Sequence, residues 1–523
     1  MAKSIAWYRS GWTVLVTSLL LPPLGLVLLW LRPTRMRRKV LGSISIAAVG
    51  VTYLVVFFGL RLEADGTGIP RVLRFHRPEA HYAKLEQSRA AQQLAAAATA
   101  PAGQPVPATP SAPAAREPAV LAKPLPPWMT STYWTDFRGP RRDGHYDEME
   151  ILTVWPAEGL KPLWRQPIGG GYASFVIAQG RAFTIEQRRN REVVAAYDVA
   201  TGRELWTHSW EAEFRETMGG DGPRATPTWH EGRVYALGAT GELHVLDAET
   251  GKLFWSRNIL RDNGADNLSW GMAAAPLVVD DKVLVLPGGF SGASVVAYHK
   301  RSGEPVWKSL NDQQAYTSPV VVTLAGHRQL LIVSGRHVMG VTIEDGKLLW
   351  SFPWATQYGI NCAQPVLVDE NHVFVSAGYG HGAALLAITR SAASGSNGAS
   401  EKWTVRSVWE NTNMKNKFNS SVLHRGYIYG LDEGILACID ARTGERKWKG
   451  GRYGYGQVLL ASGHLIITTE GGDLVLVRAT PERHEELARF SAIEGKTWNH
   501  PAIAGGLLLV RNAREMAAFQ LSR

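Results

Sequence analysis

The sequence predicts an all-β body, an eight-bladed β-propeller of four-stranded blades, preceded by an N-terminal transmembrane helical hairpin and an Ala/Pro-rich linker. A phrase ending in Trp recurs through residues 160–523, short strand patterns precede its copies, and two uncharged stretches stand near the N-terminus. The 53 Gly and 19 Trp residues agree with a turn-rich body anchored by Trp. The predicted divisions are the hairpin (1–62), a juxtamembrane segment (63–98), the linker (99–127), a lead-in segment (128–159) and the propeller (160–523).

The net charge of +10 belongs to the N-terminal quarter of the chain. Residues 1–127 hold 15 basic and 5 acidic side chains, whereas residues 128–523 hold 41 of each sign. A diffuse basic surface for nucleic acid is therefore excluded for the body. Two cysteines, Cys362 and Cys438, are too few for a disulfide framework or a four-cysteine metal site.

Two apolar stretches, Gly11–Leu31 and Val40–Leu60, predict the transmembrane hairpin. Each has 21 residues without a charge, and a helix of that length spans a hydrocarbon core of about 30 Å. Pro22 and Pro23 are expected to kink the first helix. A cleaved signal peptide is the alternative for the first stretch, but no small-residue cleavage site precedes the basic run 32–39.

The orientation of this hairpin is not decided by counting charges. The connecting loop carries five positive residues, Arg32, Arg35, Arg37, Arg38 and Lys39. The other side carries six, Lys3, Arg9, Arg61, Arg71, Arg74 and Arg77. The density of charge in the short loop favours a cytoplasmic loop, which would place both termini and the body outside the cytoplasm.

The predicted linker follows a stretch with helical character, His81–Ala98. Residues 99–127 are rich in Ala and Pro, and four prolines between 105 and 113 exclude a helical stalk. We expect an extended, mobile segment that reaches about 3 Å per residue.

The body is identified by its repeat. AYDVATGRELW, which ends at Trp206, returns as VLDAETGKLFW, AYHKRSGEPVW, VTIEDGKLLW and CIDARTGERKW, and Gly precedes Trp by four residues each time. The pattern indicates a hairpin in which Asp and Thr close the turn and Gly supplies a positive φ. Because Trp recurs at one position in these copies, we assign it to packing between blades rather than to chemistry.

The anchors give the number of blades. Successive units end at Trp164, Trp206, Trp255, Trp307, Trp350, Trp409 and Trp448, with Phe490 where the next Trp is due. The longest unit carries a solvated insertion, Ser391–Ser400. The last unit, Thr497–Leu521, shows only three strand patterns, and we expect Leu160–Gln166 to supply its outer strand. This closure leaves no open edge and gives eight blades; a seven-bladed ring is the alternative.

The AxDxxTGxxxW phrase resembles the repeat of pyrroloquinoline-quinone (PQQ) propellers. That superfamily includes quinoprotein alcohol dehydrogenases and the lipoprotein propeller of the outer-membrane protein assembly machinery. The resemblance covers about 360 residues, and Trp134–Ser174 also looks like the start of bacterial PQQ-like propellers of unassigned activity. It implies an exported propeller, here held at the bacterial inner membrane on the periplasmic side.

The resemblance does not by itself imply the cofactor. The dehydrogenases clamp the quinone with an adjacent Cys pair and hold Ca²⁺ with Glu, Asn and Asp. Cys362 and Cys438 are 76 residues apart, no match for the Ca²⁺ ligands or the catalytic Asp is found, and no C-x-x-C-H haem site is present. We expect no catalytic residue, no metal site and no cofactor; PQQ with Ca²⁺ remains the alternative.

Each predicted blade opens with a polar or aromatic cluster just before its first apolar strand. If these clusters align, a ligand site at the funnel of the ring is lined by Tyr172, Arg224, Trp270, Tyr316, Asn361, Asn419, Tyr455, Trp498 and His500. Aromatic walls with amides and one guanidinium suit a planar ligand or a peptide strand. The alternative is that these residues line a water-filled channel and that His500 is merely hydrogen-bonded.

Two functions from different classes follow. The first is a membrane-anchored, non-enzymatic scaffold that binds a protein partner or a small ligand outside the cytoplasm, with a monomeric propeller. The second is a PQQ-dependent alcohol dehydrogenase with an atypical site. A membrane-bound sensor differs from the first only in what the hairpin contacts. The fold does not choose among these, because function belongs to the site.

Overall fold

The computed structural model describes residues 10–56, 60–64, 70–75, 78–99, 126–391 and 402–522. The chain divides into two compact units, one of residues 1–81 with Thr217–Gly219 and one that contains the remainder. The predicted linker and the insertion Ser391–Ser400 lie outside the described residues, apart from a few residues at their ends.

The first unit contains three apolar helices, α1 (Gly11–Leu20), α2 (Pro22–Trp30) and α3 (Met36–Val56). Within the described residues, α3 is the one helix long and apolar enough to cross a membrane. It begins four residues before the predicted second stretch, so that three basic residues occupy its first turn. A hairpin of strands β1 (Leu60–Ala64) and β2 (Pro70–Phe75) follows.

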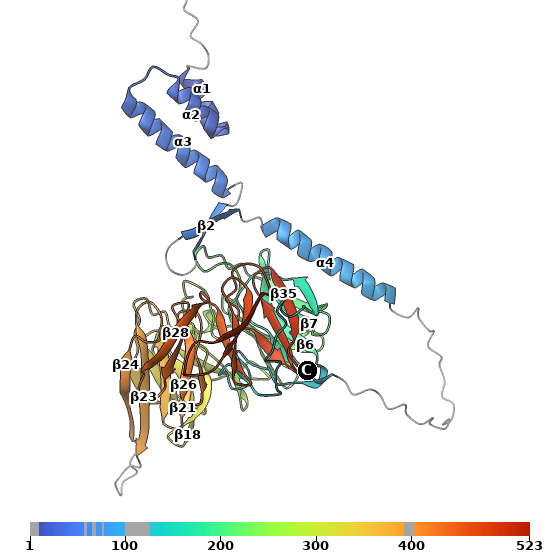
Figure 1. The fold of residues 1–523 in the computed structure, drawn as a ribbon, viewed down its shortest axis with the longest axis vertical. Coiled ribbons are helices and arrows are strands. Elements are labelled where there is room, and N and C mark those ends of the chain that lie inside the picture. Colours follow the sequence, from blue (N-terminus) through green and yellow to red (C-terminus); the bar gives the residue numbers. More distant parts are fainter. Residues whose placement is uncertain are drawn as a thin grey trace, which may run out of the picture. The chain divides into compact units, whose positions relative to one another are not determined.

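The first predicted span, Gly11–Leu31, is not one helix. The backbone leaves the helical region at Leu21 (φ −139°, ψ 78°), and Pro22 starts a new helix at a position where its missing N–H costs nothing. A Cβ on Gly25 would lie 2.4 Å from Ser18 Cα, so α1 and α2 fold back on each other (Figure 1). With 10 and 9 residues, each is only about 15 Å long, too short to span.

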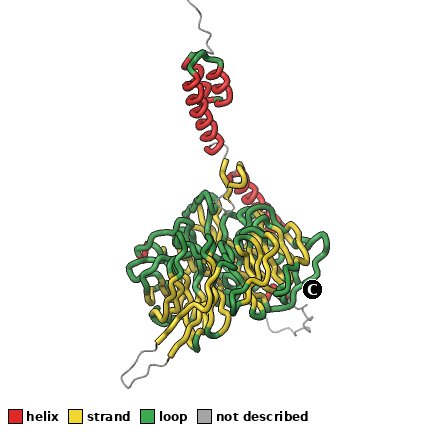
Figure 2. Tube along the Cα trace, turned by 60° about the vertical axis from the view of Figure 1, so that its left-hand side comes forward, coloured by secondary structure: helices red, strands yellow, loops and turns green. Residues whose placement is uncertain are grey.

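The second unit is a ring of eight sheets, as predicted. Figure 2 shows strands throughout this ring. Blade 1 comprises β5 (Val176–Ala178), β6 (Arg181–Arg188), β7 (Arg191–Asp198) and β8 (Glu204–Glu211). Blade 2 comprises β9 (Thr228–His230), β10 (Arg233–Leu237), β11 (Glu242–Asp247) and β12 (Leu253–Asn258). Blade 3 comprises β13 (Leu277–Val279), β14 (Lys282–Val285), β15 (Val295–His299) and β16 (Pro305–Ser309). Blade 4 comprises β17 (Val320–Leu324), β18 (His327–Val333), β19 (His337–Val341) and β20 (Leu348–Pro353).

The other four blades repeat this antiparallel order. Blade 5 comprises β21 (Val366–Asp369), β22 (His372–Ala377), β23 (Gly382–Ser391) and β24 (Lys402–Asn411); the long β23–β24 hairpin projects beyond its neighbours (Figure 1). Blade 6 comprises β25 (Val422–His424), β26 (Tyr427–Asp432), β27 (Ile435–Asp440) and β28 (Arg446–Arg452). Blade 7 comprises β29 (Gln457–Ala461), β30 (His464–Thr468), β31 (Asp473–Arg478) and β32 (Glu486–Ser491). Blade 8 comprises β33 (Ala502–Ala504), β34 (Leu507–Arg511), β35 (Glu515–Gln520) and β4 (Trp164–Pro167).

The ring closes through blade 8. Strand β4, from the N-terminal side, pairs antiparallel with β35, from the C-terminus, with Trp164 opposite Ala518. The predicted closure is therefore confirmed. Joining both ends in one sheet removes the open edges that an unclosed ring would expose.

The recurring Trp packs on the recurring Gly of the next blade. The turn forms as predicted, with Asp198 Oδ1 accepting the Thr201 N–H at 2.9 Å and Gly202 at a φ of 67°. A Cβ on Gly202 would lie 2.5 Å from the indole of Trp164, and one on Gly251 would lie 2.5 Å from that of Trp206. The same contact recurs at Gly303, Gly346 and Gly444. The Gly thus serves the turn and also receives the neighbouring indole, and the predicted packing role of Trp is confirmed.

The segment Ser131–Glu148, named the plug segment, runs through the centre of the ring. The Arg142 guanidinium donates to the carbonyl oxygens of Ala275, Pro276 and Pro319, which directly precede the inner strands β13 and β17. Arg138 donates to the Ser421 oxygen at 2.9 Å, just before β25. Strand β3 (His145–Tyr146) adds to the inner edge of blade 7. The side chains of the plug segment therefore occupy the centre beneath the loops that carry the predicted funnel residues.

Candidate functional site

The face of the ring on which every innermost strand begins is named the mouth face. Loops that lead into β5, β9, β13, β17, β29 and β33 gather there and carry six of the predicted site residues, Tyr172, Arg224, Trp270, Tyr316, Tyr455 and Trp498. Since strands alternate in direction, the loops between the second and third strands of each blade reach the same face. The mouth face thus receives two loops from each blade.

Aromatic side chains from blades far apart in sequence meet at this face. Trp498 stacks on Tyr172 with ring centroids 5.3 Å apart, and its other neighbour is Phe418 at 4.6 Å. Phe418 also meets Tyr455 at 5.4 Å and Tyr379 at 6.4 Å. We name Tyr172, Trp498, Phe418, Tyr455 and Tyr379 the aromatic arc. A separate pair, Trp270 and Tyr316, stands 6.1 Å apart.

Three cations are interleaved with these rings. Lys496 Nζ lies 4.0 Å from the Trp498 ring centroid, and Lys417 Nζ lies 4.5 Å from that of Tyr379. The Arg224 guanidinium lies 5.5 Å from the Tyr172 ring and is held by carbonyl oxygens of its own loop. Cation–π contacts of this kind orient both partners and keep the positive charges at the ring faces.

Sequence reasoning missed four members of this site, Tyr379, Lys417, Phe418 and Lys496. Lys417 and Phe418 directly precede Asn419, but the prediction places the amide, and not the aromatic ring, at the site. Lys496 directly precedes the cluster that contains Trp498. Tyr379 lies in the β22–β23 loop. This loop joins the second and third strands of its blade and therefore lies at the mouth face.

Three predicted funnel residues are used by the fold instead. Asn361 and Asn419 are each 1% exposed, and Asn361 donates to the Ser334 oxygen at 2.8 Å while Asn419 accepts from Asn416 at 3.0 Å. His500 is 4% exposed and stacks on Trp134 of the plug segment at 6.3 Å. Burial and the nearby Arg138 lower the pKa of His500 to about 3, so it stays neutral. The three side chains thus form hydrogen bonds within the fold, as a polar residue in a lead-in loop often does with its own loop.

The repeat, the closed ring and the mouth loops can now be compared with known proteins. A sequence model of a family described as outer membrane protein assembly factor BamB matches residues 190–450. The chain belongs to the PQQ-like β-propeller family.

Curated relatives of this PQQ-like propeller include enzymes and assembly factors. The chain is 35% identical over 167 residues to a 1-butanol dehydrogenase (cytochrome c) of Thauera butanivorans. It is 29% identical over 145 residues to the outer membrane protein assembly factor BamB of Vibrio cholerae. These alignments cover 31% and 27% of the chain, and only 22% and 34% of the relatives' lengths.

Solved structures agree on the fold. BamB from Moraxella catarrhalis superposes with a TM-score of 0.50 at 14% identity, covering 69% of this chain and 100% of that one. A quinohemoprotein alcohol dehydrogenase from Pseudomonas putida HK5 gives a TM-score of 0.51 at 13% identity, covering 75% of this chain and 80% of that one. At such identities the likeness concerns the fold alone.

The residues at the mouth of this PQQ-like propeller do not fit the quinone and Ca²⁺ of its dehydrogenase relatives. Cys362 lies before β21, whereas Cys438 is buried in β27, and both are free thiols. Burial raises the pKa of the Cys362 thiol to about 12. Among the described residues no three His, Cys, Asp or Glu side chains gather where they would hold a metal ion. Within the described residues, the mouth therefore has no cluster of carboxylates of the kind that holds Ca²⁺.

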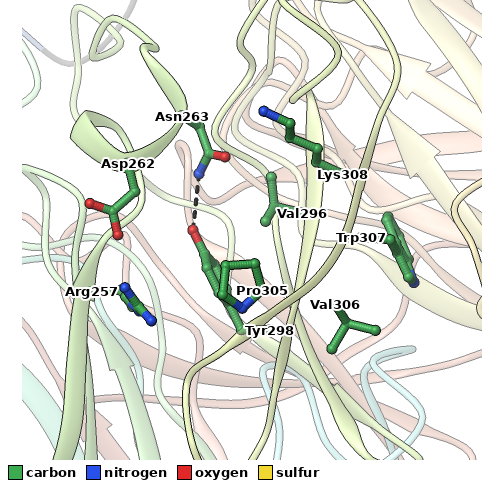
Figure 3. A pocket seen from close by; sticks show the side chains of 9 residues that line it. All are labelled: Arg257, Asp262, Asn263, Val296, Tyr298, Pro305, Val306, Trp307 and Lys308. Carbon is green, nitrogen blue, oxygen red and sulfur yellow. Dashed lines mark hydrogen bonds between the residues drawn. The ribbon is translucent and has the colours of Figure 1, made fainter.

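A second hollow lies at the outer edge, between blades 2 and 3 (Figure 3). It encloses about 490 Å³, and its lining includes Val296, Tyr298 and Trp307. Asn263 Nδ2 donates to the Tyr298 hydroxyl across it at 2.9 Å. Arg257 at its rim already donates to the Gly303 oxygen at 2.9 Å. We attribute this hollow to packing between blades, and it carries no functional assignment.

Glu192 links blades 1 and 2 and predicts a pH dependence of stability. Its carboxylate accepts from the Ala239 N–H at 2.7 Å and from Trp210 Nε1 at 3.1 Å, and burial raises its pKa from 4.5 to about 7. The folded state then holds this proton more tightly than the unfolded chain, so stability falls as pH rises from about 4.5 to about 7, by roughly 3 kcal/mol in all. Urea midpoints at pH 5 and pH 8 should show this loss in the wild type and less of it in Glu192→Gln, whereas the exposed Glu249→Gln should behave as wild type.

Proposed function

We propose that this chain is a membrane-anchored PQQ-like propeller that binds a partner through its mouth face outside the cytoplasm, as a scaffold and not as an enzyme. The observation that carries the proposal is the aromatic arc with its interleaved cations. Five aromatic rings from blades 1, 5, 6, 7 and 8 converge there, together with Lys417 and Lys496. A binding scaffold needs neither the cysteine clamp nor the Ca²⁺ ligands of the dehydrogenases.

The chemistry of the arc favours an extended protein segment, or a small planar ligand, that carries an acidic group. Flat rings offer large contact area at little conformational cost. Cations already placed at the ring faces pair with a carboxylate while a neighbouring ring stacks on the same group. Glu470 accepts from Trp498 Nε1 at 2.9 Å, which fixes the indole and prearranges the surface.

The fold of the first unit supports a propeller outside the cytoplasm. Because α1 and α2 fold back on each other, the start of α1 lies close to the end of α2. A Cβ on Gly11 would lie 3.6 Å from the Arg32 side chain. The residues before α1 then share a side with the loop before α3. That side carries seven positive residues, Lys3 and Arg9 with the five of the loop, against four after α3. The positive-inside rule now favours a cytoplasmic N-terminus and a single crossing by α3.

Reporter fusions test this topology. A reporter active only outside the cytoplasm should be active after Ser522 and inactive before Met1. A two-span hairpin would instead make both fusions active, because it places both termini outside. If the fusion after Ser522 is inactive, the propeller is cytoplasmic and the proposed location is wrong.

Substitutions in the aromatic arc test the binding role. With a photocrosslinking side chain in place of Tyr316, Trp498→Ala and Phe418→Ala should each lower the yield of the crosslinked complex about tenfold or more, since removing one anchoring ring costs 1.4 kcal/mol or more. The matched control is Phe254→Ala, an aromatic on β12 that is 45% exposed. Equal yields for all variants would remove the arc from the site.

The dehydrogenase is the second candidate because of the 35% match to 1-butanol dehydrogenase. Titration of the full chain with PQQ and Ca²⁺, followed by dye reduction with alcohols, discriminates the two. Saturable binding near micromolar concentrations with alcohol-dependent reduction would overturn the scaffold proposal. We expect neither, because the mouth residues do not provide the clamp or the Ca²⁺ ligands.

A further inference from the structure

Helix α4 (Pro78–Thr99) is fastened to the propeller from Tyr82 onward. Leu85 is 1% exposed and Arg89 is 6% exposed. Arg89 donates to the Pro167 oxygen at 2.7 Å, pairs with Glu204 at 3.2 Å and lies 5.1 Å from the Tyr197 ring centroid. A buried Arg with a carbonyl, a carboxylate and a ring as partners fixes both the position and the direction of the helix.

The contacts of α4 run along blades 8 and 1. Tyr82 and Glu86 lie at the mouth face, where Glu86 pairs with Arg189 of the β6–β7 loop at 2.9 Å and the Tyr82 hydroxyl lies 4.0 Å from where a Cβ of Gly170 would stand. One turn beyond Arg89, Gln92 donates to Gln166 at 3.0 Å. The chain from the membrane helix therefore reaches the propeller at its mouth face.

The chain enters the ring itself from the opposite face. Helix α5 (Pro127–Thr130) stands beside the β5–β6 turn, where the Gln179 N–H donates to the Ser131 oxygen at 2.7 Å. That turn lies at the far end of the inner strand, away from the mouth. Both helices that flank residues 100–126 therefore contact the propeller, α4 through Arg89 and Gln92 and α5 beside the β5–β6 turn.

The segment that joins α3 to the docked part of α4 is short. Four Cα steps lead from Val56 to Leu60, and the hairpin adds only its width because Leu60 pairs with Phe75. Three more steps lead to Pro78, and one helical turn leads to Tyr82. Together these reach at most about 35 Å. A chain fastened only at α5 would have a tether of about 70 residues and could turn either face to the bilayer.

We propose that α4 turns the mouth face of the propeller toward the membrane, so that the partner of the aromatic arc is a protein presented at the membrane surface. The exposed side chains agree with this orientation. Tyr358, at 65%, and Phe290, at 63%, are the most exposed aromatic residues among the described residues of the propeller. Both lie in mouth-face loops, before β21 and before β15, and aromatic side chains favour the bilayer interface. The inference rests on the proposed anchoring by α3 and deepens it.

Energy transfer to lipids tests the orientation in the full chain reconstituted in vesicles of mixed zwitterionic and anionic lipids with dye-labelled headgroups. A donor dye is placed at Tyr358→Cys on the mouth face or at Glu249→Cys on the opposite face, with the dye-treated wild type as baseline because Cys438 is buried and Cys362 half-buried. The mouth-face dye should transfer at least twofold more efficiently. Equal transfer, or stronger transfer from Glu249→Cys, would overturn the proposal.

Releasing α4 from the propeller supplies the matched comparison. Leu85→Asp with Arg89→Ala should abolish the difference between the two dyes, whereas the exposed Lys84→Ala should preserve it. If the two dyes still differ when α4 is released, α4 does not set the orientation. Absence of transfer from both dyes would instead contradict membrane anchoring. Free lipid headgroups competing with the crosslinked complex would identify lipid, in place of a protein, as the occupant.

Discussion

Replacing Arg142 by Ala is expected to lower the free energy of unfolding by about 3–5 kcal/mol, because the substitution leaves the half-buried ion-pair partner Asp136 and several buried carbonyl groups unsatisfied. Arg142 is 2% exposed, pairs with Asp136 at 3.0 Å and donates to the residues that precede β13 and β17. Urea unfolding followed by Trp fluorescence measures the loss. Arg142→Lys should recover little, since an ammonium group does not reproduce the planar fork.

The control for Arg142 is its neighbour. Arg141 is 49% exposed and pairs with Asp143 and Asp147, both at 2.9 Å. Exposed pairs contribute little, so Arg141→Ala should cost less than about 1 kcal/mol. Similar losses for the two variants would show that the plug segment does not stabilise the ring through Arg142.

Gly251→Ala is expected to cost about 2–5 kcal/mol, combining strain at a φ of 73° with the clash of its Cβ against Trp206 at 2.5 Å. Gly232→Ala, in the same blade, separates the two effects. Its φ is 74° and nothing lies within 4 Å of its Cβ, so only the strain of about 1–2 kcal/mol should appear. Urea unfolding of both variants gives the difference that belongs to the indole.

A double-mutant cycle gives the decisive outcome for this contact. In a Trp206→Ala background, Gly251→Ala should cost no more than Gly232→Ala, because the clashing ring is gone. If the cost of Gly251→Ala is the same with and without Trp206, the packing of Trp on Gly is not what restricts this position.

The fold was predictable because its determinants repeat. A Gly four residues before Trp recurs in five copies, and each copy carries the same turn and the same contact. The closing strand at Trp164 was inferred from the missing outer strand of the last unit, a counting argument that needs no coordinates. The break at Leu21 was less accessible, since Pro22 is compatible with either a kink or a full reversal.

The candidate site was predicted only in part, for a physical reason. Position in a lead-in loop places a residue near the mouth, yet it does not say whether the side chain faces the ligand or its own loop. Trp498 and Tyr172 contact each other at the mouth face. By contrast, Arg224 is held by carbonyl oxygens of its own loop, and Asn361, Asn419 and His500 form buried hydrogen bonds. The plug segment contains no repeat, so no sequence pattern indicated its contacts with blades that are distant in sequence.

The plug segment also constrains how the ring is made. Residues 131–148 are synthesised before every blade, yet their partners lie in blades 1, 2, 3, 4, 6, 7 and 8; Glu148, for example, accepts from the Gly505 N–H at 2.7 Å. The first part of the body therefore cannot form its final contacts until nearly the last residue has been synthesised. Contacts of such long sequence separation form slowly. A chain that stalls or is cleaved before blade 8 lacks the complete contacts of the plug segment and the β4–β35 pairing that closes the ring. Quality control can distinguish such a chain from the finished molecule.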